Sequence, residues 1–253
     1  MTDDELYARG TRTAAACWAA FASATPGAAV HHPPYVVVAV FPDEPERSIY
    51  NNAILARELA AAQRSAALEA MEELYAASGV GSFAAWVHEG DHAMHDELRR
   101  RGYTVDTTTR AMAMPLDGIS VPPPDLDLVA AEWREHLRLI NAPSTLLDAL
   151  DPTALHLLVA RNDDANVATG FGFDHDGDCG IYNLGTLKHV RRRGIGGALT
   201  SRLVHDAIGR GCRTASLQST PLAERMYAAL GFRDLGRTIE YVRMRRRIPR
   251  AGR

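Results

Sequence analysis

Residues 191–198 read Arg-Arg-Arg-Gly-Ile-Gly-Gly-Ala and carry the strongest structural signal of this chain. A strand-like run at 180–187 precedes them, and a segment with apolar residues at helical spacing, 194–210, follows. The first N–H groups of a helix lack internal partners and attract anions, and glycines let a phosphate approach the backbone. The stretch therefore predicts an anion-binding corner, with a solvated basic turn as the alternative reading.

Two common phosphate-binding motifs fit this corner poorly. A P-loop ends in Gly-Lys-Ser/Thr, but the only lysine of the chain is Lys188, before the glycines. A dinucleotide-binding fingerprint needs a third glycine where Leu199 stands. Neither motif explains the pattern, so it must come from another kind of anion-binding site.

A second motif lies downstream at residues 214–232. A buried-type strand is predicted at 215–218, and a helix at 221–230 with Pro221 in its first turn and Gly231 as its stop. Tyr227 stands on this helix, before Gly231-Phe232. Together with Arg191-x-x-Gly194-x-Gly196, this pattern resembles the GCN5-related N-acetyltransferase (GNAT) superfamily over roughly residues 126–245. The resemblance implies an α/β class with a mixed sheet, the GNAT fold, and transfer of an acetyl group from acetyl-CoA directly to an amine.

The resemblance also implies roles for individual residues. Tyr227 would act as general acid toward the CoA thiolate, and a backbone N–H near Leu187 would stabilise charge on the thioester oxygen. In the family, the strand before the glycine-rich corner, here 180–187, splays from the strand that follows it and leaves a slot for the thioester. Gly185 is the expected bulge residue of this strand. The expected cofactor-binding residues are Gly185, Thr186, Leu187, Arg191, Arg192, Arg193, Gly194, Ile195, Gly196, Gly197, Ser219, Thr220 and Ala223. Lys188-His189 and Thr220 depart from the pattern, where a Pro-acidic pair and Asn are common.

An internal repeat divides the chain. Residues 48–55 resemble 180–187 at an offset of 132. The same offset aligns Gly79 with Gly211 and the run 82–87 with 214–219, and a slip of three then aligns 101–103 with 230–232. We therefore predict two tandem GNAT-like domains: a degenerate scaffold at 1–117, a Pro-rich linker at 118–125 and a catalytic domain at 126–253.

The first half lacks the residues that the chemistry needs. Ala62 and Arg64 stand opposite Gly194 and Gly196, and Leu98 stands opposite Tyr227. We expect this half to pack as scaffold beside the acceptor cleft. Its histidines, His88, His92 and His95, have no cysteine or carboxylate partner at metal-ligand spacing, so we expect no metal.

The general base and the acceptor are left open by the sequence. His175, Asp176, Glu132 and Glu240 are base candidates by residue type, while His156 in an apolar strand is expected to be structural. Asn183 could face the acceptor, although its recurrence as Asn51 favours a structural role. The acceptor is expected to be the amine of a small molecule or a peptide. The oligomeric state is not predicted.

Composition and charge exclude several protein classes. The 253 residues include 46% hydrophobic and 23% charged residues and carry a net charge of -3, which is unlike a disordered or a wholly basic chain. No apolar run is long enough to span a membrane. The acidic residues 3–5 and three scattered cysteines favour a cytoplasmic location.

Two other functions compete with catalysis. One is a non-catalytic acyl-CoA-binding sensor or interaction module. The other is nucleic-acid binding through the arginine run of residues 243–253, for which a solvated tail is the favoured reading.

Overall fold

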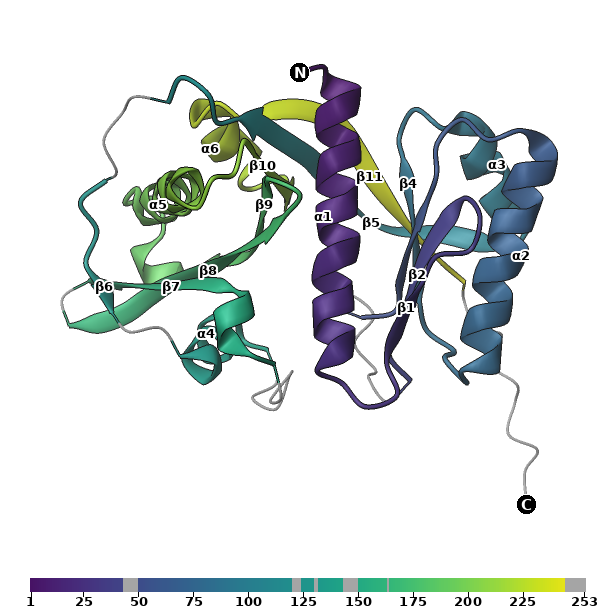
Figure 1. Cartoon of the computed structure of the whole chain (residues 1–253), viewed down its shortest axis with the longest axis horizontal. Coiled ribbons are helices and arrows are strands. Elements are labelled where there is room, and N and C mark those ends of the chain that lie inside the picture. Colours follow the sequence, from purple (N-terminus) through teal and green to yellow (C-terminus); the bar gives the residue numbers. More distant parts are fainter. Residues whose placement is uncertain (43–49, 120–123, 130–131, 143–149, 163, 244–253) are drawn as a thin grey trace. The chain divides into compact units, whose positions relative to one another are not determined.

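The computed structural model describes residues 1–42, 50–119, 124–129, 132–142, 150–162 and 164–243 (Figure 1). The helices are α1 Asp3–Ser23, α2 Ala61–Ala77, α3 His92–Arg100, α4 Trp133–Ile140, α5 Ile195–Gly209 and α6 Glu224–Ala229. The strands are β1 Ala29–His31, β2 Val36–Val40, β3 Asn52–Leu55, β4 Ala84–His88, β5 Tyr103–Pro115, β6 Leu128–Val129, β7 His156–Asn162, β8 Ala165–His175, β9 Asp178–Thr186, β10 Thr214–Ser219 and β11 Arg233–Arg243. None of the helices described is long and apolar enough to cross a membrane.

The strands form one mixed sheet, which confirms the predicted α/β class. Their order is β1-β2-β3-β4-β11-β5-β10-β9-β8-β7-β6. Strand β3 runs parallel to β4, and β9 runs parallel to β10. The hairpin pairs β7–β8 and β8–β9 are antiparallel. Each parallel pair is connected through a helix, α2 or α5, as a parallel connection requires.

The chain forms two compact units that exchange segments between the predicted halves. Unit 1 contains Met1–Pro26 and Thr109–Gly236, and unit 2 contains Gly27–Thr108 and Arg237–Arg253. Helix α1 therefore belongs with most of the second half, and the end of β11 belongs with the first half. The predicted domains at 1–117 and 126–253 are based on the sequence repeat, whereas the two units are groups of residues that pack compactly together. Because these are different properties, the domain division stays a prediction.

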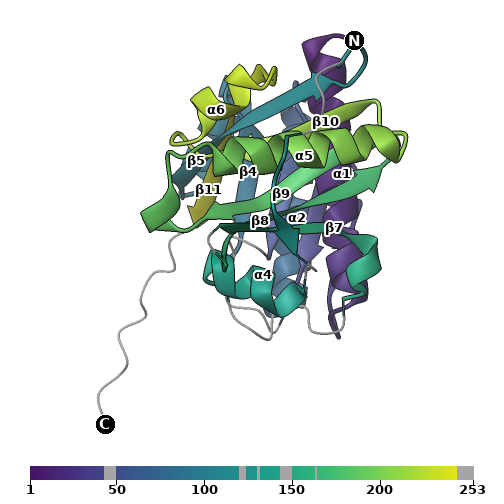
Figure 2. The same cartoon turned by 90° about the vertical axis from the view of Figure 1, so that its left-hand side faces the viewer.

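Helices cover both faces of the sheet in unit 1. Helix α5 lies across one face, and α1 lies behind the strands on the other (Figure 2). Phe21 of α1 reaches Phe171 of β8 with 6.2 Å between ring centroids. At Gly10 a Cβ atom would lie 2.9 Å from the Cβ of Ser216, so only glycine lets α1 approach β10 this closely. Helix α1 is thus an integral part of this unit.

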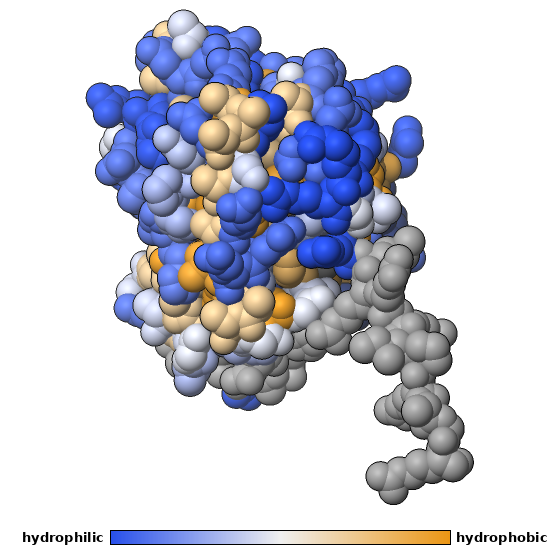
Figure 3. Space-filling view, turned by 90° about the vertical axis from the view of Figure 1, so that its right-hand side faces the viewer, coloured by the Kyte–Doolittle hydropathy of each residue, from blue (hydrophilic) through white to orange (hydrophobic). Residues whose placement is uncertain are grey.

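Unit 2 has its own core between the sheet and two helices. The buried members include Leu68, Met71 and Tyr75 of α2 and Met94 and Leu98 of α3. The Tyr75 ring stacks on Phe83 with centroids 4.0 Å apart. Figure 3 shows the side of the molecule on which α2 lies in Figure 1. This surface is mainly hydrophilic and carries bands of apolar residues.

The repeat is visible in the backbone as well as in the sequence. Asn51 and Asn183, 132 residues apart, both adopt a left-handed conformation, with φ of 54° and 50°. The aligned glycines do the same: Gly79 and Gly211 have φ of 70° and 90°, and Gly102 and Gly231 have φ of 83° and 99°. A left-handed φ is rare outside glycine, so its recurrence at aligned positions supports the duplication.

One predicted boundary in the second half differs from the structure. The helix predicted at 221–230 is α6, which begins at Glu224, and Pro221 lies in the turn before it. Element ends of this kind are the part of a helix that sequence patterns fix least well.

Candidate active site

Strands β9 and β10 separate where the resemblance implied a slot. Their ladder pairs Thr214 with Asp178 and ends at Leu217 with Ile181. Strand β10 continues beyond this point and pairs with β5 as far as Ser219. The described ladder contains no pair between β10 and the last residues of β9, so the β9 edge facing β10 is open there.

A bulge in β9 lies at this point of separation. Phe171 pairs with Tyr182 and Thr169 pairs with Gly185, so Asn183 and Leu184 both stand opposite Gly170. The expectation that Gly185 is the bulge residue was therefore wrong, because the left-handed Asn183 makes the extra turn. Gly185 is needed for another reason: a Cβ atom there would lie 3.1 Å from Cγ2 of Ile140 on α4.

The open edge of β9 offers particular backbone groups. The N–H of Leu187 donates to Val167 O on β8 at 2.9 Å, so it cannot stabilise a thioester oxygen as expected. Neighbouring residues of a strand direct their backbone groups to opposite sides. Thr186 therefore faces away from β8, and its carbonyl accepts from Nε of Arg191 at 2.9 Å. By this alternation, the N–H groups of Thr186 and of Leu184, the second residue of the bulge, are directed to the open edge.

The glycine-rich corner has the geometry of an open helix start. Gly194 is the N-cap of α5 with φ of 83°, and Arg192 before it also has a left-handed φ of 64°. The N–H of Ala198 is the first that bonds back, to Gly194 O at 2.9 Å. Within the described residues no backbone partner is recorded for the N–H groups of 195–197. All three arginines, 191–193, are exposed beside this corner.

The corner and the open edge of β9 lie next to each other. A Cβ atom at Gly196 would lie 3.4 Å from Oγ1 of Thr186 and 3.5 Å from Sδ of Met226 on α6. The helix start, the strand edge and α6 thus enclose one region. Of the predicted residues, Gly185, Thr186 and residues 194–197 are brought together here.

Tyr227 lies on α6 and is almost fully buried. Its ring packs edge-on against Phe232 with 5.8 Å between centroids. Burial raises the pKa of Tyr227 to about 12, since a phenolate is poorly solvated in the core. The hydroxyl therefore stays protonated at neutral pH. Ala223 caps the start of α6, and the Ser219 hydroxyl donates to Thr220 O at 2.9 Å in the preceding turn.

Two of the base candidates, His175 and Asp176, lie away from the open edge. His175 and Asp176 lie at the β8–β9 turn, at the opposite end of β9 and roughly 25 Å from Thr186 at the usual rise per residue. Glu240 belongs to unit 2. His156 bonds Asp206 at 2.7 Å, which confirms that it is structural. Glu132 is exposed at the start of α4.

Sequence reasoning missed several residues of this region. Met226 and Ile140 close the region around Gly196 and Gly185 but look like ordinary core residues in the sequence. Arg110 of β5 and Glu224 of α6 form an ion pair between segments 114 residues apart, for which no local pattern exists.

The first half lacks the corresponding opening. Strand β3 pairs with β4 directly after Asn51, from Asn52 with Ala84 to Ile54 with Trp86. The Trp86 indole also donates to Oδ1 of Asn52 at 3.2 Å. Helix α2 starts from Ala60 with φ of -63°, without a left-handed glycine. Strand pairing thus occupies the edge that is open in β9.

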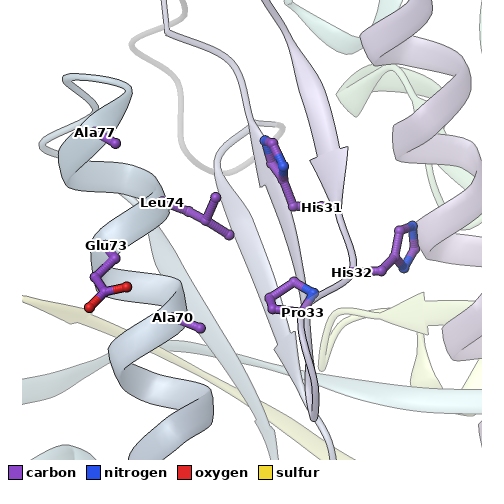
Figure 4. Close-up of a pocket in the computed structure, with 7 residues that line it drawn as sticks. All are labelled: His31, His32, Pro33, Ala70, Glu73, Leu74 and Ala77. Atoms are coloured by element: carbon purple, nitrogen blue, oxygen red, sulfur yellow. The ribbon is translucent and has the colours of Figure 1, made fainter.

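Outside this region, the described residues form a surface pocket but no metal-binding group. Among the described residues, no group of three or more His, Cys, Asp or Glu side chains could hold a metal ion. A surface pocket of about 430 Å³ lies between β1 and α2 in unit 2, lined by His31, His32, Pro33, Ala70, Glu73, Leu74 and Ala77 (Figure 4). None of the predicted site residues lines it.

The chain is similar to known acetyltransferases. Residues 153–234 match the model of the acetyltransferase (GNAT) domain. A GCN5-related N-acetyltransferase from Kribbella flavida is 20% identical with a TM-score of 0.71, and the match covers 92% of this chain and 95% of that one. A GCN5-related N-acetyltransferase from Sphaerobacter thermophilus is 16% identical with a TM-score of 0.59 over 83% of this chain and 80% of that one.

A tandem protein has a similar fold. The tandem GNAT protein from the clavulanic acid biosynthesis pathway is 12% identical with a TM-score of 0.56, over 82% of this chain and 77% of that one. No curated protein matches the chain. At these identities the structures show the fold alone, and the family model matches residues 153–234 only. The chain therefore has the GNAT fold and contains a match to the acetyltransferase (GNAT) domain in its C-terminal half.

Proposed function

We propose that this protein is an acetyl-CoA-dependent N-acetyltransferase with one cosubstrate site per chain, in unit 1. The observation that carries the proposal is the open edge of β9 beside the glycine-started helix α5. The first half has the same turn at Asn51 but closes that edge by pairing β3 with β4, which supports a single site.

The residues of the open region fit the parts of acetyl-CoA. The N–H groups of 192–197 would hold the pyrophosphate, with the side chains of Arg191, Arg192 and Arg193 adding charge. Thr186 and Leu184 offer backbone groups to the amides of the pantetheine arm, which would lie along β9 like an added strand. Ser219, Thr220 and Ala223 would contact the arm from the turn before α6. Leu187 follows this edge in the chain. Its N–H is already bonded to Val167 O, so we propose no hydrogen bond from it to acetyl-CoA.

Two groups of this chain would assist the transfer. When bound, acetyl-CoA supplies an activated acetyl group: the amine nitrogen forms a bond to the carbonyl carbon, and the bond from carbon to sulfur breaks. The N–H of Leu184 or Thr186 would stabilise the charge on the carbonyl oxygen. Tyr227 would give its phenolic proton to the departing sulfur. Solvent would take up the proton that the amine loses and return one to Tyr227.

The acceptor is proposed to be the amine of a small molecule or a peptide. The proton of the attacking amine would leave through water, because His175 and Asp176 lie at the far end of β9. We propose a cytoplasmic location and no membrane or nucleic-acid partner; most of the arginine run, 244–253, lies outside the described residues.

A non-catalytic acyl-CoA-binding module is the second candidate. It is favoured by one observation: His175 and Asp176 lie at the opposite end of β9 from the open edge, so neither can serve as base there. The two candidates share cosubstrate binding and differ in turnover.

The test combines calorimetry with a thiol-release assay over a panel of amines. Tyr227→Phe should lower kcat by roughly 10²-fold, as expected for loss of a general acid, with the Kd for coenzyme A unchanged. Tyr75→Phe is the control, since it removes another buried hydroxyl, bonded to Ala39 O at 3.1 Å in unit 2. Binding without turnover on any amine would support the second candidate. Absence of coenzyme A binding would refute both.

A further inference from the structure

Arg110 joins the start of α6 to the sheet in unit 1. It lies on β5 opposite Ser219, the last residue of β10. Its Nε is 3.1 Å from Oε2 of Glu224, the first residue of α6. Its Nη1 pairs with Oδ2 of Asp234 at the start of β11. The side chains of Arg110 and Glu224 are only 18% and 21% exposed, so this pair is shielded from solvent much better than a surface pair.

Asp234 fixes the guanidinium from the side opposite α6. Its second oxygen, Oδ1, accepts from the N–H of Gly236 at 2.9 Å, which anchors the carboxylate to the backbone of β11. The pairing raises the pKa of Arg110, first through its hydrogen bond to Asp234. The guanidinium donates a hydrogen bond to Asp234 and forms an ion pair with Glu224. The hydrogen bond gives the planar group a direction that an ammonium could not supply equally well.

Helix α6 depends on such contacts for its position. It contains six residues, and a helix this short is unstable without tertiary packing. Glu224 stands three residues before Tyr227, so the two side chains lie on neighbouring parts of the helix surface. Side chains alternate along β5, and Met112 and Met114 on the Arg110 side belong to the same core cluster as Tyr227. Arg110 thus holds the N-terminal end of the helix that carries Tyr227.

We propose that Arg110 is a positioning residue for Tyr227: through Glu224 it sets the place of the hydroxyl that protonates the departing sulfur. The proposal rests on the proposed function, because Arg110 acts only through Tyr227 and touches no substrate atom. A displacement of about 1 Å in such a group can reduce turnover by up to 10²-fold.

The first experiment separates positioning from binding and stability. Arg110→Met should lower kcat roughly tenfold or more while KM and Kd for acetyl-CoA stay within twofold of wild type. Arg210→Met is the matched control. Nε of Arg210 lies 2.6 Å from Oδ2 of Asp174, and both side chains are about one third exposed. Arg210 stands at the C-terminal end of α5, opposite its glycine-rich start. It should lower Tm without changing kcat.

The second experiment asks whether Arg110 acts through Tyr227. In a Tyr227→Phe background, Arg110→Met should change kcat by less than twofold, since residues that act as a unit are not additive. Arg110→Lys, which keeps the charge, should fall between wild type and Arg110→Met and replaces it if that variant does not fold.

The outcomes are distinguishable. An equal loss of kcat in both backgrounds, or equal losses in Arg110→Met and Arg210→Met, would overturn the positioning role while leaving the enzyme assignment intact. Absence of coenzyme A binding in the wild-type protein would instead overturn the proposed function, and the positioning role with it.

Discussion

His136 on α4 makes the stability of this protein depend on pH in a defined direction. The residue is fully buried, and its Nδ1 lies 2.8 Å from Oγ1 of Thr169. The Thr169 hydroxyl donates its single proton to Leu158 O at 2.9 Å, so it can only accept from the ring. Nδ1 therefore carries the proton, and Nε2 is an acceptor with no partner in the described part of the chain.

A second proton on this ring would be buried without a partner. Burial lowers the pKa of His136 from 6.5 to about 4. The unfolded chain takes up a proton near pH 6.5, whereas the folded chain does so only near pH 4, so stability falls as pH decreases through this window. The full shift corresponds to roughly 3 kcal/mol, and about 2 kcal/mol of it is lost by pH 5.

Urea unfolding followed by circular dichroism at pH 7.5, 6.5, 5.5 and 5.0 measures this loss. His136→Phe keeps an aromatic ring beside Trp133, whose ring is stacked on His136 with 4.9 Å between centroids, and removes the titrating group. Its free energy of unfolding should fall by about 2 kcal/mol less than that of the wild type between pH 7.5 and 5. His189→Phe, at an exposed histidine, is the control and should follow the wild type. Parallel losses in the wild type and His136→Phe would refute the buried, neutral histidine.

Two further predictions concern the fold and the helix start. Deleting residues 1–26 should abolish cooperative unfolding of unit 1 in calorimetry, because α1 covers the sheet face that contains Phe171. A fully cooperative transition in the truncated protein would contradict this. Gly194→Ala should lower the free energy of unfolding by about 1 kcal/mol, since its φ of 83° is strained for alanine. Gly209→Ala, where no atom lies within 4 Å of the added methyl, should be neutral or stabilising in the same urea titration, and an equal loss in both variants would be evidence against strain at Gly194.

The local signals of the site could be read from the sequence because they depend on backbone conformation. The spacing of Gly194 and Gly196 predicted that both lie at the start of a helix, and the structure has them at the start of α5. The GNAT fold and the mixed sheet followed from the same motifs. The roles of the site residues themselves stay predictions until the binding and turnover experiments are done.

The long-range features could not be read in this way. Nothing in α1 indicates that Gly10 must pack on Ser216, because a small residue within a helix has no unique partner in sequence. The bulge was placed at Gly185 because glycine is the usual residue for it, but asparagine also tolerates a left-handed φ, and Asn183 takes that role. The Leu187 N–H was misassigned because strand register decides which amides face outward, and register is a tertiary property.

The two halves differ in strand pairing after the same turn. Asn51 and Asn183 make the same left-handed turn, yet the strand after Asn51 pairs with β4 while the strand after Asn183 leaves β10. The Asn51 side chain also bonds both the N–H and the C=O of Phe41, which holds the first turn in place, whereas Asn183 is exposed. Glycines introduced at the start of α2 would free a helix end but would leave the β3 edge occupied. The proposed binding mode places the pantetheine arm along such an edge, so we expect that this change alone would not make the first half bind coenzyme A.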